Sequence, residues 1–341
     1  MPEQRPIRGA VPVLVMPFDD DGAIDDDSLR RELDFCLEAG AQAICFGMGS
    51  ESSMLTDAER AHVWSLAARH LDGAVPLVAA TAHASREGTI ALTRLARDSG
   101  VDCAMVNPQP GFPPAPLVRA GGSGGDQFVA LFRDLSARVG LPLMIQDAGG
   151  NAPAEVILRA AREAEQVVSA KLESPGAPLK IGQVVAGLRA SGHLAEGGSA
   201  VPGETGAAQE PARRVTVLGG ANGNLLPEEL EHGAVGTMPH PGIIDAFRRV
   251  CDQYAAGDAP GGRETYLRLV APLLRAVAIV GQGDGGGAML WAQKALLQRA
   301  GVIRTTRCRA PTGPLPDAVM DRVYRYVDGA GLLASRWRQR R

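Results

Sequence analysis

Lys171 combines a reactive side chain with a strand-end position at which such side chains can act. The sequence contains 32 arginines and three lysines, so positive charge is otherwise supplied by a residue that cannot act as a neutral amine. Lys171 stands in VVSAKLES, directly after an apolar run typical of a buried strand. Burial among apolar side chains disfavours a charged amine, and a neutral lysine can form a Schiff base with a ketone. The alternative is a strand-end lysine that forms an ion pair with a neighbour such as Glu173.

A second candidate feature is the segment GMGSES, residues 47–52, which follows another apolar run. In a tight turn, small residues such as Gly47, Gly49 and Ser50 can direct backbone N–H groups at one point and hold a carboxylate. Thr56 has the position of an N-cap for the helix that follows. A glycine-rich turn that binds no ligand is the commoner alternative.

Eight apolar runs with strand character alternate with segments of helical period, and this order positions the candidate residues. The strands are predicted at residues 11–18, 43–46, 75–80, 103–106, 143–145, 167–170, 215–218 and 234–238. The helices between them are predicted at 26–39, 57–70, 86–99, 127–139, 154–164, 177–189 and 227–232. The pattern favours the α/β fold of a (β/α)8 TIM barrel, in which active groups follow strand ends. A doubly wound open sheet is the alternative, although no GxGxxG follows the first strand.

The chain divides into two predicted parts. Residues 1–240 are expected to form the barrel, and 241–341 a C-terminal helical extension whose clearest helices are 267–280 and 288–300. A surface insertion rich in Gly, Ala, Glu and Pro is expected at 191–214, on the face opposite the strand ends. The low-complexity segment 111–126 follows the fourth strand and is a candidate lid, and 281–287 is expected to be a loop.

Composition excludes several classes of function. The formal charge of −3 gives no basic face for nucleic acid and no charged block for a membrane surface. Five scattered cysteines, without a CxxC pair, indicate a reduced chain, and the N-terminus has no apolar core of a signal peptide. We expect a soluble cytoplasmic protein that binds neither nucleic acid nor membrane. The other two lysines, Lys180 and Lys294, lie in helical patterns and are expected to be solvated or to cap helices.

Several motifs together resemble a known family. They are GAVPVLVMPFDDDGAID at the start, GMGSES after the second strand, VVSAKLES at the sixth, GAVGTMP at the eighth and KALLQRAGVIRTTRCRAPTGPL near the end. In this order they resemble the dihydrodipicolinate synthase and N-acetylneuraminate lyase superfamily of class I pyruvate aldolases and lyases. The resemblance implies a TIM barrel, chemistry without a cofactor, and a homotetramer or homodimer.

Carried over residue by residue, the resemblance implies a role for each motif. Lys171 becomes the Schiff-base lysine for pyruvate or another 2-keto acid. Gly47, Gly49 and Ser50 would hold the keto-acid carboxylate. Thr237 and Met238 of GAVGTMP would also contact the substrate.

Two departures from the family pattern argue against dihydrodipicolinate synthesis itself. Gln146 stands where the family has a catalytic Tyr, and the amide of Gln has no titratable proton to shuttle. In the synthase, an arginine binds the carboxylate of the second substrate, and the matching position in this sequence is near Asn151. Gln146 and Asn151 are therefore expected to be substrate contacts and not acid–base groups.

Other residues must then move protons. Asp147 and Glu51 are strand-end carboxylates that could face the same cavity as Lys171, and they are the candidate acid–base groups. The alternatives are that Asp147 is a cap and that Glu51 is a buried acceptor that stiffens its turn. His83, after the third strand, is a further candidate with a rim position as its alternative. The histidines show no metal-ligand spacing, so no metal is expected.

These residues predict a lyase, either an aldolase or a dehydratase, that forms a Schiff base between Lys171 and a 2-keto acid. The first alternative is a catalytically silent barrel that binds a keto acid or sugar acid, because the usual Tyr is missing. A weaker alternative is a metal-dependent lyase.

Overall fold

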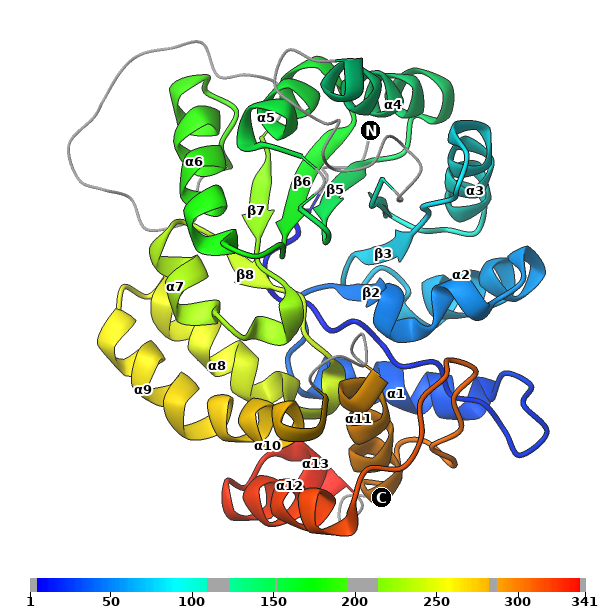
Figure 1. Cartoon of the computed structure of the whole chain (residues 1–341). Helices are drawn as coiled ribbons and strands as arrows, with labels where there is room; N and C mark the ends of the chain where they lie inside the picture. The colour runs from blue at the N-terminus through cyan, green and yellow to red at the C-terminus, as the bar shows by residue number, and fades with distance from the viewer. Residues whose placement is uncertain (1–4, 109–122, 151, 196–213, 282–286, 338–341) are drawn as a thin grey trace.

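The strands form a parallel array surrounded by helices. The computed structural model describes residues 5–108, 123–150, 152–195, 214–281 and 287–337. Figure 1 shows the helices around the outside of the strands, with the last helices gathered at one side. Six strands form one parallel sheet in sequence order: β2 (Ile44–Phe46), β3 (Leu77–Ala80), β4 (Cys103–Val106), β5 (Leu143–Asp147), β6 (Val167–Leu172) and β7 (Thr216–Leu218). The predicted alternation of parallel strands and helices is confirmed.

The first and last strands pair with each other. β1 (Gly9–Ala10) runs parallel to β8 (Gly236–Thr237). The first strand was predicted at 11–18, whereas β1 spans only Gly9–Ala10. Backbone hydrogen bonds nevertheless continue past β1, from Val11 N to Thr237 O at 3.0 Å and from Val13 N to Pro239 O at 2.7 Å, so the start of the predicted segment is paired as well.

Single bridges connect this pair to both edges of the larger sheet. A parallel bridge joins Val13 to Cys45 of β2, and another joins Gly219, just after β7, to Thr237 of β8. Each strand therefore lies next to the strands that precede and follow it in the sequence, and the first strand, β1, lies next to the last, β8. This adjacency brings residues from distant parts of the chain to one end of the array.

The helices between the strands agree with prediction to within a few residues. They are α1 (Asp26–Glu38), α2 (Asp57–Leu71), α3 (Arg86–Asp98), α4 (Ser123–Val139), α5 (Ala154–Glu163), α6 (Ala177–Ala190) and α7 (Leu226–Glu231). Thr56 is the N-cap of α2, and its side chain exchanges hydrogen bonds with Glu59 in a capping box. Short 3-10 turns also occur, including η1 (Met48–Ser50).

Further helices follow β8. They are α8 (Ile244–Ala255), α9 (Ala259–Leu269), α10 (Ala271–Gly281), α11 (Gly287–Arg299), α12 (Asp317–Gly329) and α13 (Leu333–Arg336). The single helix predicted at 267–280 is wrong, because the chain breaks at Val270 between α9 and α10. Pro272 lies in the first turn of α10, where its missing N–H is tolerated and prevents one continuous helix.

Strand residues alternate between two hydrophobic clusters. Met144 of β5 belongs to a small inner cluster enclosed by the strands, whereas Ile145 belongs to the large outer cluster beneath the helices. Because side chains of a strand alternate between its faces, Gln146 follows Met144 to the inner face and Asp147 follows Ile145 to the outer face. This one-residue offset separates two residues that were both expected in the site.

Several predicted features fall wholly or largely outside the described residues. These are the candidate lid at 111–126, the insertion at 191–214, the loop at 281–287 and the substrate contact Asn151. None of the helices that the structure describes is both long and apolar enough to cross a membrane.

Candidate active site

Lys171 lies within the sixth strand and not just after it. β6 extends to Leu172, and the register pairs Lys171 with Gln146 of β5 and with Leu218 of β7. The residue is 4% exposed. Backbone pairing on both sides therefore holds the base of the Lys171 side chain at the inner face.

A carboxylate accompanies the lysine. Glu173 Oε1 lies 2.9 Å from Lys171 Nζ, and it accepts a 2.6 Å hydrogen bond from Gln146 Nε2. Glu173 Oε2 accepts a hydrogen bond from the backbone N–H of Ala221 at 2.8 Å. Burial disfavours the charged carboxylate, but the Lys171 ammonium and these two donors outweigh it and hold the pKa of Glu173 below its ordinary value. The sequence offered Glu173 only as a structural partner of Lys171, and the ion pair is present.

Gly220 makes the close packing around this pair possible. A Cβ atom at Gly220 would lie 2.7 Å from Lys171 Cε and 2.4 Å from Glu173 Oε2. Such distances exclude any side chain at this position without displacement of the pair. The glycine after β7 therefore forms one wall of the site.

Glu229 is a second buried carboxyl group near the pair, and the sequence gave no reason to select it. It projects from α7 against Gly219, is 1% exposed, and its Oε2 has no hydrogen-bond partner among the described residues. Burial raises the pKa of Glu229 to about 8, and the nearby negative charge of Glu173 adds to the shift. Glu229 is therefore a neutral acid at pH 7 beside a charged one.

The predicted carboxylate turn uses its serine for its own structure. Ser50 Oγ donates to Leu14 O at 2.6 Å and accepts from the Gly47 N–H at 3.1 Å. Ser50 is fully buried. Its hydroxyl thus fixes the turn. The Ser50 N–H donates to Gly47 O at 3.0 Å, so the N–H groups of Met48 and Gly49 are left as the candidate donors for a ligand.

Glu51 is tied to the C-terminal segment and makes no contact with Lys171. Glu51 Oε2 lies 2.5 Å from Lys294 Nζ, and Oε1 accepts the N–H groups of Arg309 at 2.6 Å and Ala310 at 2.7 Å. The expectation that Lys294 is solvated is wrong, because its side chain is fully buried between α11 and this turn. The alternative of Glu51 as a buried acceptor matches these contacts.

Asp147 lies on the outer face, as the alternation of β5 requires. Its Oδ2 accepts hydrogen bonds from Lys180 Nζ at 2.7 Å and from Ser174 Oγ at 2.9 Å. Lys180 was also expected to be solvated or to cap a helix, but it instead joins α6 to the end of β5 with a largely buried side chain. The structure does not bring Asp147 to Lys171.

His240 packs against the turn from the end of β8. A Cβ atom at Gly49 would lie 2.3 Å from His240 Cε1, so the glycine is required by the imidazole next to it. Burial, together with the positive charge of Lys171, lowers the pKa of His240 to about 4. A neutral imidazole is therefore present, and its position after the eighth strand was the only sequence signal for it.

Three further residues were predicted as candidates: Thr237, Met238 and His83. Met238 belongs to the inner cluster, whereas the buried hydroxyl of Thr237 has no hydrogen-bond partner among the described residues. His83 Nδ1 is bonded to Ser85 at the start of α3. Within the described ranges, no group of three or more His, Cys, Asp or Glu side chains could hold a metal ion.

Comparisons with known proteins agree on one family. Residues 6–109 match the model of the dihydrodipicolinate synthetase family. The chain is 28% identical over 317 residues to L-2-keto-3-deoxyarabonate dehydratase of Azospirillum brasilense, covering 91% of this chain and 89% of that protein. It is 30% identical to an uncharacterized DapA-like lyase of Rhizobium meliloti, over 48% of this chain and 53% of that one.

Solved structures give the same result for the fold. Dihydrodipicolinate synthase from Rhodopseudomonas palustris has a TM-score of 0.76 at 22% identity, with 94% of this chain and 97% of that chain covered. The synthase from Thermotoga maritima has a TM-score of 0.77 at 21% identity, with 96% and 100% covered. The fold is therefore shared along nearly the full length of these chains.

Proposed function

The chain belongs to the dihydrodipicolinate synthase superfamily of lyases that act on keto acids, and from that premise we propose that it dehydrates a 2-keto-3-deoxy sugar acid through a Schiff base on Lys171. The single observation that carries the proposal is the buried pair of Lys171 and Glu173, 2.9 Å apart. The relative named as a keto-deoxy sugar acid dehydratase supports the choice of dehydration over aldol cleavage.

Glu173 has the position to activate the lysine. The carboxylate takes a proton from the Lys171 ammonium, and the neutral amine then adds to the C2 carbonyl of the substrate. Glu173 returns that proton to the former carbonyl oxygen, which leaves as water, so that an iminium ion forms and Glu173 is again a carboxylate. The iminium ion withdraws electrons from C3. Gln146 and the Ala221 N–H hold the carboxylate in place during these steps.

The elimination then needs one group that takes a proton and returns it. Glu173 removes the C3 proton to give an enamine, whose electron pair expels the C4 hydroxyl group. The same proton, returned by Glu173, lets that group leave as water. Hydrolysis of the remaining Schiff base releases the unsaturated product and restores Lys171. Glu173 thus takes the part that Tyr has in the family pattern, which neither Asp147 nor Glu51 has the position to take.

The substrate carboxylate is assigned to the turn at 47–51. Ser50 stabilises this turn, and the N–H groups of Met48 and Gly49 remain as candidate donors. Gly49 also accommodates His240, whose neutral imidazole could accept or donate a hydrogen bond to a substrate hydroxyl.

We interpret the strand array as a closed (β/α)8 barrel at residues 1–240, because single bridges continue both edges of the six-stranded sheet into the β1–β8 pair. The helices within 241–341 then form the C-terminal extension. A homotetramer or homodimer is part of the proposal and is based on the family resemblance. A cytoplasmic location is also proposed, and it is based on the five scattered cysteines without a CxxC pair.

Product analysis tests the proposed reaction. The protein is incubated with 2-keto-3-deoxy-L-arabonate and with pyruvate plus an aldehyde, and products are identified by mass spectrometry. Loss of one water from the sugar acid is expected, with no pyruvate released. Release of pyruvate would identify an aldolase, and saturable binding of both compounds without any product would favour the silent barrel.

A further inference from the structure

A cleft of about 550 Å³ lies between α1, the end of α11 and α12, and shares no lining residue with the Lys171 site. Among the lining residues that the structure describes, three are arginines and none is acidic. The lining residues are Arg31, Arg299, Arg304, Gln298, Tyr324, Ala295, Gly301 and Ile303. A concave surface with this charge is suited to an anion.

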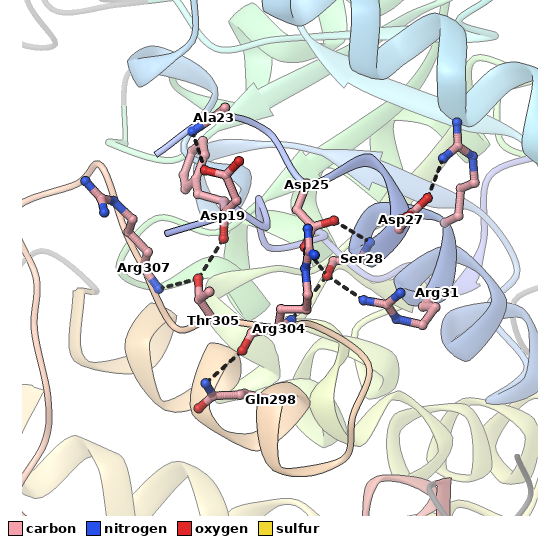
Figure 2. A network of polar contacts seen from close by, with 12 residues as sticks. Asp19, Ala23, Asp25, Asp27, Ser28, Arg31, Gln298, Arg304, Thr305 and Arg307 are labelled. Atoms are coloured by element: carbon pink, nitrogen blue, oxygen red, sulfur yellow. Dashed lines mark hydrogen bonds and ion pairs between the residues drawn. The ribbon is translucent and has the colours of Figure 1, made fainter. Parts of the chain in front are cut away.

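Ser28 holds two of the arginines together. Arg31 Nη2 donates to Ser28 Oγ at 2.7 Å, and the backbone N–H of Arg304 donates to the same oxygen at 3.1 Å. Arg31 Nε also donates to Val302 O at 2.9 Å. Figure 2 shows the Arg31 side chain directed at Ser28, and Arg304, in the segment after α11, with its side chain directed at Asp25. Their positions are therefore set by hydrogen bonds before any ligand binds.

These contacts leave donors unused. Arg304 Nε lies 2.6 Å from Asp25 Oδ2, but neither of its Nη atoms donates a hydrogen bond within the described residues. Arg31 forms no ion pair with any carboxylate in the part of the chain that the structure describes, and its Nη1 has no acceptor there. Asp19 and Asp27 lie farther away. Their negative charges also raise the pKa of Arg304, but neither residue lines the cleft.

The third arginine contributes differently. Both Nη atoms of Arg299 pair with Asp328, at 2.8 and 2.7 Å, and its guanidinium lies 4.7 Å from the centre of the Tyr324 ring. Arg299 is thus already paired with a carboxylate, and its contact with the cleft is through the neighbouring ring of Tyr324, which also lines it. Ile303 and Ala295 add an apolar surface next to it.

We propose that this cleft is a binding site for a small oxyanion, a carboxylate or a phosphate, held by Arg31 and Arg304. The planar guanidinium groups match the paired oxygens of either anion. The ring of Tyr324 and the apolar side chains leave room for a short carbon skeleton attached to it. The site is independent of the reaction assigned to Lys171.

Calorimetric titration of the full-length protein with inorganic phosphate and, separately, with malonate tests the proposal. Saturable binding of at least one probe is expected, with a dissociation constant of roughly 1 mM or tighter. Arg304→Gln and Arg31→Met are each expected to weaken that binding by about tenfold or more, as loss of a charge-assisted contact does. Binding of phosphate alone or of malonate alone supports the site and identifies its ligand class.

Matched controls separate this site from the active site. Arg30→Gln removes a neighbouring arginine that pairs with Asp27 and does not line the cleft, so binding is expected to be unchanged. Lys171→Ala is likewise expected to leave it unchanged. Arg304→Gln removes the ion pair with the buried Asp25, but that carboxylate keeps the hydrogen bonds from Ser28 N and Oγ, so the variant is expected to remain folded, which a melting curve checks.

Two results would overturn the proposal. One is the absence of saturable binding for both probes. The other is binding that survives both Arg304→Gln and Arg31→Met; its loss in Lys171→Ala would then place the anion at the active site.

Discussion

Glu173 Oε1 lies 2.9 Å from Lys171 Nζ, and both side chains are at least nine-tenths buried. The two residues are one strand repeat apart, so the same face of β6 and its continuation presents both. In the proposed mechanism Lys171 supplies the nucleophile, and Glu173 is the proton acceptor within direct reach of it. The proposal thus needs no third residue to form the Schiff base.

Glu173→Gln is the first prediction. The amide keeps the shape and one acceptor oxygen but cannot take a proton, so kcat for the sugar acid is expected to fall by about 10²–10⁴-fold. Steady-state kinetics measure the change. Glu87→Gln, at an exposed position on α3, is the control and is expected to keep full activity. Unchanged kcat in Glu173→Gln would remove Glu173 from the mechanism.

Gly220→Ala is expected to impair the site without removing any functional group. The added Cβ overlaps Lys171 Cε and Glu173 Oε2, so the pair must move apart. A displacement of about 1 Å can lower kcat by about 10²-fold. Gly313→Ala is the matched control, because no atom lies within 4 Å of a Cβ there. Equal activity of the two variants would show that the pair tolerates displacement.

The buried ion pair between Glu51 and Lys294 predicts an effect on stability. Lys294→Met leaves the Glu51 charge buried without its partner, which is expected to lower the free energy of unfolding by about 3–5 kcal/mol. Adding Glu51→Gln removes that charge and is expected to recover part of the loss. Urea unfolding of the two single variants and the double variant gives the coupling between them. Additive losses would contradict a direct interaction.

The pKa of about 8 for Glu229 predicts a pH dependence of stability. The pKa of this carboxyl group is near 4.5 in the unfolded chain. At pH values between 4.5 and about 8, the folded protein therefore keeps a proton on Glu229 that the unfolded chain releases. The free energy of unfolding therefore falls as the pH rises through this range. Glu229→Gln has no such proton, so its decline between pH 5 and 8 is expected to be shallower. Burial also raises the pKa of Glu32 to about 8. Glu32 is present in both proteins, so its effect on the pH dependence of stability cancels in the comparison.

Local patterns in the sequence were sufficient to predict the order of the strands and helices and the position of Lys171 at the sixth strand. Lys171 and its partner Glu173 are two residues apart, so a strand pattern alone places them on one face. The break at Val270 was missed because an apolar helical period continued across it, although Pro272 was the available signal.

Contacts between distant residues could not be predicted in the same way. Glu51 and Lys294 are 243 positions apart, and a helical pattern cannot reveal that one lysine on α11 faces a buried turn. Asp147 was expected in the cavity because the end of β5 was predicted two residues early, which left its face undetermined. Glu229 reaches the site from a helix, where no strand-end rule applies.

Reductive trapping of the Schiff base tests the central claim most directly. The protein is treated with sodium borohydride in the presence of pyruvate and then digested, and the modified peptide is identified by mass spectrometry. The account predicts one reduced adduct on Lys171, with Lys180 and Lys294 unmodified and no adduct in Lys171→Ala. An unmodified Lys171 in a protein that still turns over its substrate would contradict it.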